Sequence, residues 1–133
     1  YLDLASCLLA RNRHVDPEQI SGHAVRALYY ACGLADCHAE TGEQRLRDIL
    51  ENHWRTMAGG KMYVTGGVGA RPSGEMFGEM FELPNMDAYA ETCAAAANVF
   101  WSWRMLTIAG EARFADVLER ALYNGFLAGV SLD

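Results

Sequence analysis

Apolar residues recur at helical spacing in one segment of this chain after another, and the helical segments follow one another without strands. Residues 1–13 show the spacing of an amphipathic helix, which we expect to stop near Asn12. A second helix is predicted from Ser21, a candidate N-cap, to about Ala39. Its expected buried face comprises Ala24, Ala27, Leu28, Ala31 and Leu34.

The helical pattern resumes after Thr41-Gly42 and runs to Gly59-Gly60, with Leu46, Ile49, Leu50 and Trp54 on its apolar face. Two further helices are predicted over residues 93–108 and 112–126, with Gly110 between them. Successive helical pairs are typical of a bundle, a solenoid or an (α/α) toroid. Periodicity alone does not choose among these three architectures.

Residues 61–86 break the helical pattern, because they are rich in glycine and contain Pro72 and Pro84. Loops of this length inside compact domains are usually functional or disordered. The interleaved apolar residues Tyr63, Val64, Phe77, Phe81 and Leu83 favour an ordered loop.

Composition and charge exclude several classes of function. The longest apolar runs are far shorter than the roughly 20 residues that cross a bilayer, so we expect no membrane partner. The net charge of −6, with eleven scattered Lys and Arg, argues against a nucleic-acid partner. The four cysteines do not form the paired framework of a secreted protein, which favours a reducing compartment and a cytoplasmic location.

The tripeptide Glu91-Thr92-Cys93 places a carboxylate and a thiol two residues apart, which is the composition of half a metal site. Residues two apart in a helix diverge by about 200° around its axis and cannot share a ligand. If both side chains bind one ion, the chain must be extended here, and the helix must begin at about Thr92 or Cys93. Without a metal, Glu91 would be a carboxylate at a helix N-terminus and Cys93 a small buried hydrophobe.

Several ordered blocks of sequence resemble the β-L-arabinofuranosidases of glycoside hydrolase family 127. The resemblance covers nearly all of residues 20–133. The blocks are Gly22-His23-Ala24-Val25-Arg26-Ala27-Leu28-Tyr29, Lys61-Met62-Tyr63-Val64-Thr65-Gly66-Gly67-Val68-Gly69, Gly74-Glu75-Met76-Phe77-Gly78, Leu83-Pro84-Asn85, Tyr89-Ala90-Glu91-Thr92-Cys93-Ala94, Phe114-Ala115-Asp116, Glu119-Arg120-Ala121-Leu122-Tyr123-Asn124 and Ala128-Gly129-Val130-Ser131-Leu132-Asp133.

The resemblance implies an all-α fold in which helical hairpins form part of an (α/α)6 barrel. Such a barrel needs about twelve helices of roughly 11 residues each, so 133 residues do not complete it. We therefore expect residues 1–133 to be an internal part of a barrel-shaped catalytic domain, with an active-site loop at about 61–92.

The resemblance also implies a general acid/base, because it identifies a glutamate in the glycine-rich loop as the group that protonates the departing oxygen. Gly74-Glu75-Met76-Phe77-Gly78 matches that motif and makes Glu75 the candidate. The adjoining Gly78-Glu79-Met80-Phe81-Glu82 nearly repeats it, so Glu79 is the rival. Glu75 is favoured because only its copy has glycine after phenylalanine.

The resemblance further implies a zinc-bound cysteine that acts as the nucleophile and releases β-L-arabinofuranosyl residues with retention. Glu91 and Cys93 match two of the zinc ligands. The nucleophile and its neighbouring cysteine lie downstream in the family, and this sequence contains no adjacent cysteine pair. We therefore expect the isolated chain to be inactive and to bind zinc weakly.

His23 matches a family histidine that contacts the sugar, although a histidine at a helix start can equally be structural. Phe100, Trp101 and Trp103 are predicted to pack in the core, whereas Tyr63 and Tyr89 flank the loop and are candidates for the cleft. Two alternatives to a glycosidase remain open: an α/α-barrel sugar epimerase and a non-catalytic helical interaction module. For a part of a barrel, exposed helix faces predict association into homo-oligomers.

Overall fold

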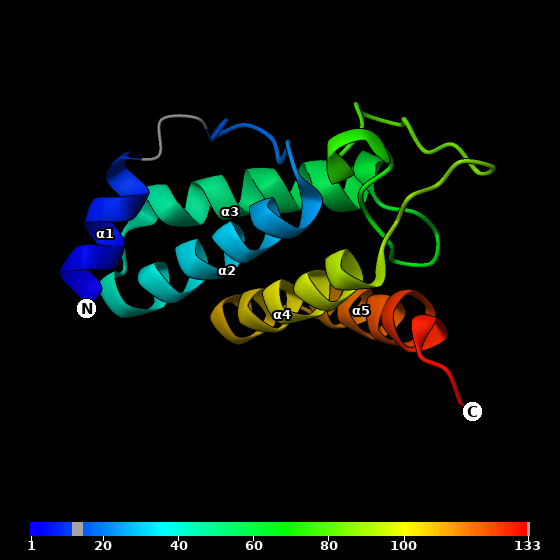
Figure 1. The fold of residues 1–133 in the computed structure, drawn as a ribbon. Helices are drawn as coiled ribbons and strands as arrows, with labels where there is room; N and C mark the ends of the chain where they lie inside the picture. Colours follow the sequence, from blue (N-terminus) through cyan, green and yellow to red (C-terminus); the bar gives the residue numbers. More distant parts are fainter. Residues whose placement is uncertain (12–14, 133) are drawn as a thin grey trace.

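The computed structural model describes residues 1–11 and 15–132, and these residues form helices joined by one long loop. The helices are α1 (Leu2–Arg11), α2 (Ala24–Thr41), α3 (Gln44–Thr56), α4 (Thr92–Ala109) and α5 (Ala112–Arg120). Figure 1 shows α2 and α3 as one antiparallel hairpin and α4 and α5 as a second, packed alongside it. The all-α prediction is therefore confirmed for the described residues, while the expected end of the first helix near Asn12 lies outside them.

Helix α2 begins later than the sequence predicts. Its N-cap is His23, in extended conformation and without a side-chain cap, so the prediction of Ser21 as N-cap is wrong. The chain is diverted before the helix because Gly22 has a positive φ of 79° and its carbonyl accepts a hydrogen bond from Phe77 N–H. The helix ends at Thr41, two residues past the predicted end, where Gly42 adopts the left-handed conformation with φ of 67°.

Helices α3 and α5 both continue into π-helical segments, Met57–Lys61 and Ala121–Phe126. The glycines at 59 and 60 therefore lie within a helical turn, and the chain leaves it after Lys61. Helix α4 occupies Thr92–Ala109, and Gly110 follows it with φ of 68°, as the sequence predicts.

An aromatic cluster joins the two hairpins in the core. The Trp54 ring on α3 packs edge-on against Trp101 of α4 at 5.4 Å and against Phe114 of α5 at 4.6 Å between ring centroids. Trp101 and Phe114 are fully buried. The predicted core position is wrong for Trp103 and Phe100, which are exposed; Phe100 lies at the surface beside the exposed Tyr29 ring of α2.

The predicted face of α2 is buried at Ala24, Leu28, Ala31 and Leu34, while Ala27 is only partly buried. Arg104 of α4 forms an ion pair with Asp36 of α2 at 2.8 Å, which links the two hairpins at the surface. Among the described residues, none of the helices has the length and apolar character needed to cross a membrane.

The loop between α3 and α4 is ordered and lies at the end of the molecule where α2 and α4 begin (Figure 1). The Asn98 amide of α4 donates to the Gly66 carbonyl at 3.2 Å, and Ser102 supports Asn98 from one turn further along. The Lys61 ammonium is buried and donates to the Ile20 carbonyl at 2.9 Å. These contacts fix the loop against α4 and against the segment that leads into α2.

Candidate active site

Glu75 lies at the tip of a tight turn in the long loop. Arg71 and Met76 exchange two backbone hydrogen bonds of 3.0 Å, which close the turn around Pro72, Ser73, Gly74 and Glu75. Gly74 has φ of 73° and Glu75 has φ of 53°. A left-handed conformation costs a non-glycine residue roughly 1–2 kcal/mol, and such residues cluster at functional sites. The surrounding hydrogen bonds hold the glutamate in this conformation.

His23 meets Glu75 from the start of α2. The neighbouring residues Gly22 and Phe77 are joined by a backbone hydrogen bond of 2.9 Å, and His23 pairs with Met76 as an isolated antiparallel bridge. The His23 Nε2 atom lies 2.9 Å from Glu75 Oε2. In the described part of the chain, no partner reaches the buried Nδ1 atom of His23. The fold thus brings two residues together that are 52 positions apart and that were both proposed as site residues from the sequence.

Glu79 has different surroundings. It is an exposed carboxylate 3.5 Å from Arg71, and Arg71 binds Glu82 more closely, at 2.7 Å between Nε and Oε1. The hydrogen bonds from Arg71 lower the pKa of Glu82 to about 2. Glu79 therefore belongs to a surface ion cluster with Arg71 and Glu82, whereas Glu75 forms the pair with His23.

Glu91 is the N-cap of α4, with extended φ and ψ of −65° and 153°, and the helix begins at Thr92. This is the backbone that a shared ligand site for Glu91 and Cys93 requires. The Tyr89 hydroxyl donates to Glu91 Oε2 at 3.2 Å. Partial burial, followed by hydrogen bonding and negative charge from Glu75 and then Glu91, raises the pKa of Tyr89 to about 12. Tyr89 therefore contacts the carboxylate at the start of α4 through its hydroxyl.

The donor set fits part of a zinc site. Cys93 is an exposed free thiol, and the Glu91 carboxylate is partly buried and supported by the Tyr89 hydroxyl, as metal-binding carboxylates usually are. Over residues 1–11 and 15–132, no three His, Cys, Asp or Glu side chains gather as a metal would require. The described residues thus supply two donors, and further ligands would have to come from elsewhere.

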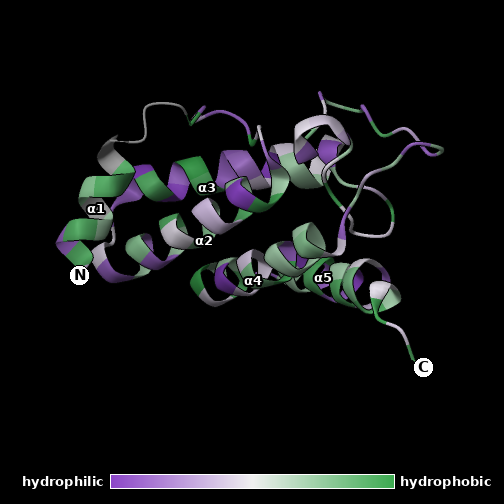
Figure 2. Cartoon of the chain, in the orientation of Figure 1, coloured by the Kyte–Doolittle hydropathy of each residue, from purple (hydrophilic) through white to green (hydrophobic). Residues whose placement is uncertain are grey.

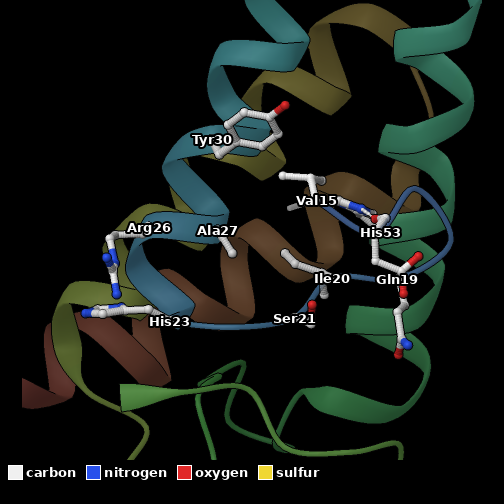
Figure 3. A pocket seen from close by; sticks show the side chains of 10 residues that line it. Val15, Gln19, Ile20, Ser21, His23, Arg26, Ala27, Tyr30 and His53 are labelled. Atoms are coloured by element: carbon white, nitrogen blue, oxygen red, sulfur yellow. Dashed lines mark hydrogen bonds between the residues drawn. The ribbon is translucent and has the colours of Figure 1, made fainter. Parts of the chain in front are cut away.

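A pocket of about 240 Å³ adjoins His23 (Figure 3). Its wall is formed by the first turns of α2, the segment 15–21 and His53 of α3, and it includes the polar side chains of Arg26 and Tyr30. The His53 Nε2 atom lies 2.7 Å from the Asp16 carbonyl, and burial lowers the pKa of this imidazole. The sequence did not indicate this pocket, because its residues become neighbours only when the segment 15–21 folds back onto α2.

Tyr63 was also a candidate for the cleft. Its side chain is buried, and its hydroxyl donates to the Pro84 carbonyl at 3.2 Å. Tyr63 thus takes part in the internal packing of the loop, while Tyr89 contacts Glu91. The sequence signal for Tyr89 is its position beside the loop, close to Glu91, together with its hydroxyl group.

The chain is similar to known glycosidases along nearly its whole length. The sequence profile of the β-L-arabinofuranosidase GH127 catalytic domain matches residues 7–133. A non-reducing end β-L-arabinofuranosidase of Bifidobacterium longum subsp. longum is 40% identical over 118 residues, which cover 89% of this chain and 18% of that protein.

Solved structures show the same relationship. A GH127 β-arabinofuranosidase superimposes with a TM-score of 0.93 at 41% identity, over 99% of this chain and 23% of that one. A GH127 β-L-arabinofuranosidase from Geobacillus stearothermophilus T6 has a TM-score of 0.85 at 47% identity, over 86% of this chain and 18% of that one. The chain therefore spans about a fifth of the length of these relatives.

Proposed function

The chain belongs to the β-L-arabinofuranosidase catalytic domains of glycoside hydrolase family 127, and from this membership we propose that it forms part of an enzyme that removes terminal β-L-arabinofuranosyl residues with retention. The sugar is taken from the relatives, whose printed activity is β-L-arabinofuranosidase. The observation that carries the proposal is the pairing of Glu75 with His23 beside Tyr89 and Glu91.

We assign the general acid/base role to Glu75. In the first step of a retaining mechanism its carboxyl group donates a proton to the departing oxygen, and in the second it takes a proton from the attacking water. The turn holds this carboxylate at the protein surface near His23 Nε2, 2.9 Å away, which orients it. Glu79 lacks such an orienting partner, since Arg71 binds mainly Glu82.

His23 is proposed to contact the sugar that is cleaved. Its Nε2 atom is adjacent to the acid/base carboxylate, so a sugar hydroxyl near the reacting bond can reach the same imidazole. The imidazole lies in the wall of the pocket, and its buried Nδ1 atom has no hydrogen-bond partner among the described residues. This role differs from that of a structural histidine because it requires Nε2 to face the substrate.

Glu91 and Cys93 are proposed to hold a zinc ion together with cysteines supplied by another part of the polypeptide, one of which is the nucleophile. Zinc would keep a cysteine deprotonated near neutral pH and hold its sulfur in place. The contribution of this chain is to present the carboxylate and thiol at the start of α4, with Tyr89 fixing the Glu91 side chain.

The rest of the enzyme is proposed to complete an (α/α)6 barrel around these helices. Figure 2 shows that α1 is largely hydrophobic, and Leu4 and Leu8 on this helix are 61% and 60% exposed. Phe100 and Trp103 are also exposed, on α4. Neighbouring hairpins would bury these apolar faces.

The test uses the full-length enzyme and methyl β-L-arabinofuranoside as substrate, because the departure of the strongly basic methoxide needs the acid. We expect Glu75→Gln to lower kcat/KM by about 10²–10⁴-fold, because an amide can neither donate nor accept the proton. Glu79→Gln is the matched control and should change kcat/KM by less than about twofold, because Glu79 belongs to the surface ion cluster with Arg71 and Glu82. A large loss in Glu79→Gln with normal activity in Glu75→Gln would reverse the assignment.

A further inference from the structure

Lys61 is the only lysine in the sequence, and it is 3% exposed although it carries a charge. Its ammonium group donates to the Ile20 carbonyl at 2.9 Å and to Gln19 Oε1 at 3.1 Å. Among the described residues, no carboxylate forms an ion pair with this ammonium. Neutral oxygens of one short segment therefore stabilise the buried charge.

The segment that supplies these oxygens depends on side chains for its backbone hydrogen bonds. Residues 15–22 form no helix or strand, and Ile20 is buried in the core. The Ile20 N–H donates to Thr56 Oγ1 at 3.2 Å, and the Ile20 carbonyl accepts from Lys61. Both backbone polar groups of this buried residue are thus satisfied by the end of α3 and the π-helical turn that follows it.

The same segment carries His23 to the candidate site. His23 lies three residues beyond Ile20, pairs with Met76 as an isolated antiparallel bridge, and has its Nε2 atom 2.9 Å from Glu75 Oε2. The loop that contains Glu75 begins at Lys61. The backbone of Lys61 thus leads into the segment that carries Glu75, while its ammonium holds the segment that carries His23.

The buried charge makes this link demanding. A buried ammonium that loses its oxygen acceptors is strongly destabilised, so the segment cannot move away from Lys61 in the native protein. A buried carbonyl that loses its donor is also destabilised, and the chain then moves to bring that carbonyl to water. Loss of the ammonium should therefore displace Ile20 and, three residues later, the His23 imidazole.

We propose that Lys61 is a positioning residue whose ammonium holds the segment 16–22, so that His23 Nε2 stays in contact with Glu75 and faces the sugar. This inference rests on the proposed function, because it assumes that His23 contacts the sugar beside the acid/base carboxylate. Lys61 itself touches no reacting atom in this role.

The experiment is a double-mutant cycle in the full-length enzyme with methyl β-L-arabinofuranoside as substrate. Lys61→Met keeps most of the side-chain length and removes the donors, and we expect kcat/KM to fall about 10–100-fold, because a small displacement of a group at the site is costly. In a His23→Ala background the same substitution should lower kcat/KM by less than about twofold, because Lys61 acts through His23. A lysine that only stabilises the fold would cause the same loss in both backgrounds.

Two further variants separate this effect from a general loss of folding. Arg104→Met is the matched control: it removes a basic side chain from the surface ion pair with Asp36 and should change kcat/KM by less than about twofold. Gln19→Leu removes one acceptor of the ammonium and keeps the bond to Ile20, so it should lower kcat/KM about two- to fivefold. If Lys61→Met does not fold, Gln19→Leu takes its place in the cycle with His23→Ala.

Equal losses in the two backgrounds, or no loss in the presence of His23, would overturn the proposal. If His23→Ala alone leaves kcat/KM unchanged, or if wild type releases no arabinose, the proposed function has failed, and crystal structures then decide the inference separately. We expect the distance from His23 Nε2 to Glu75 Oε2 in Lys61→Met to exceed about 3.5 Å, beyond hydrogen-bonding range. A contact that stays at 2.9 Å would contradict the positioning role.

Discussion

Glu75 and Glu82 belong to the same loop between α3 and α4, but their carboxylates have different surroundings. Glu82 accepts hydrogen bonds from the Arg71 guanidinium and from the Glu79 N–H, so its negative charge is satisfied within the loop. Glu75 faces His23 Nε2, 2.9 Å away, a group that can also interact with a substrate. A satisfied ion pair stabilises a loop, whereas catalysis needs a carboxylate that can exchange its proton.

The Arg71–Glu82 pair predicts a specific dependence of stability on pH. The pKa of Glu82 is lowered from 4.5 to about 2, so the pair stabilises the fold above pH 4.5 and the contribution disappears as the pH falls toward about 2. We expect Glu82→Gln to flatten the fall in unfolding midpoint between pH 4.5 and 2, as followed by urea denaturation. Glu40→Gln, which removes an exposed carboxylate of α2, is the control and should leave the slope unchanged.

At the scale of elements, the loop at 61–91 is positioned by close contact with the helices. The loop approaches helix backbone closely at Gly66, because a Cβ atom there would lie 2.7 Å from the Ala121 backbone where α5 passes into its π-helical segment. The Gly66 carbonyl also accepts the hydrogen bond from buried Asn98. The loop can therefore pack against α4 and α5 only if residue 66 has no side chain.

Substitution of glycine tests this close approach. Gly66 and Gly42 both have positive φ, 85° and 67°, but nothing lies within 4 Å of a Cβ atom built at Gly42. We expect Gly42→Ala to lower the free energy of unfolding by about 1–2 kcal/mol, the cost of the left-handed backbone alone. Gly66→Ala should cost about 1–3 kcal/mol more, because the methyl group meets backbone that cannot move aside easily. Equal losses in chemical denaturation would contradict the tight packing of the loop on α5.

At the scale of the whole molecule, the described helices leave apolar surface open on more than one side. Leu4 and Leu8 are exposed on α1, and the rings of Tyr29 and Phe100 meet on an exposed face of α2 and α4 with centroids 6.4 Å apart. Apolar patches larger than a few hundred Å² usually mark a surface that another structure covers. The proposed zinc site is divided in the same way, because the described residues supply only two candidate donors, Glu91 and Cys93, at the start of α4.

We therefore predict that the isolated 133-residue chain self-associates and does not release arabinose. Sedimentation velocity should show oligomers at micromolar concentration, and Leu4→Glu with Leu8→Glu should reduce them, because charges on the open face of α1 oppose its burial. Release of arabinose from 4-nitrophenyl β-L-arabinofuranoside should stay at the background rate. A monomeric, active chain would show that these residues close on themselves and complete a site without further segments.

The sequence by itself determined the helices, their order and the family. Helical spacing of apolar residues, with glycine at 42 and 110, placed α2 to α5 within a few residues, because local periodicity and backbone preference act over one or two turns. The resemblance to the family made Glu75 a candidate, and the tripeptide Glu91-Thr92-Cys93 was one because a carboxylate and a thiol are visible in the residue types. The prediction of the start of α2 failed. Ser21 is a residue type that often caps helices, but the backbone hydrogen bond between Phe77 and Gly22 moves the start of the helix to Ala24.

Only the tertiary structure decided which of these residues meet. The contact between His23 and Glu75 depends on the turn at 71–76 folding back onto the start of α2. The different surroundings of Glu75 and Glu79 depend on the position of the Arg71 side chain, which binds Glu82. The exposure of Trp103 beside buried Trp101 likewise depends on which side of α4 faces the other helices. Such contacts join residues far apart in the chain, so they arise from the packing of whole elements, which the spacing of residues within one element does not specify.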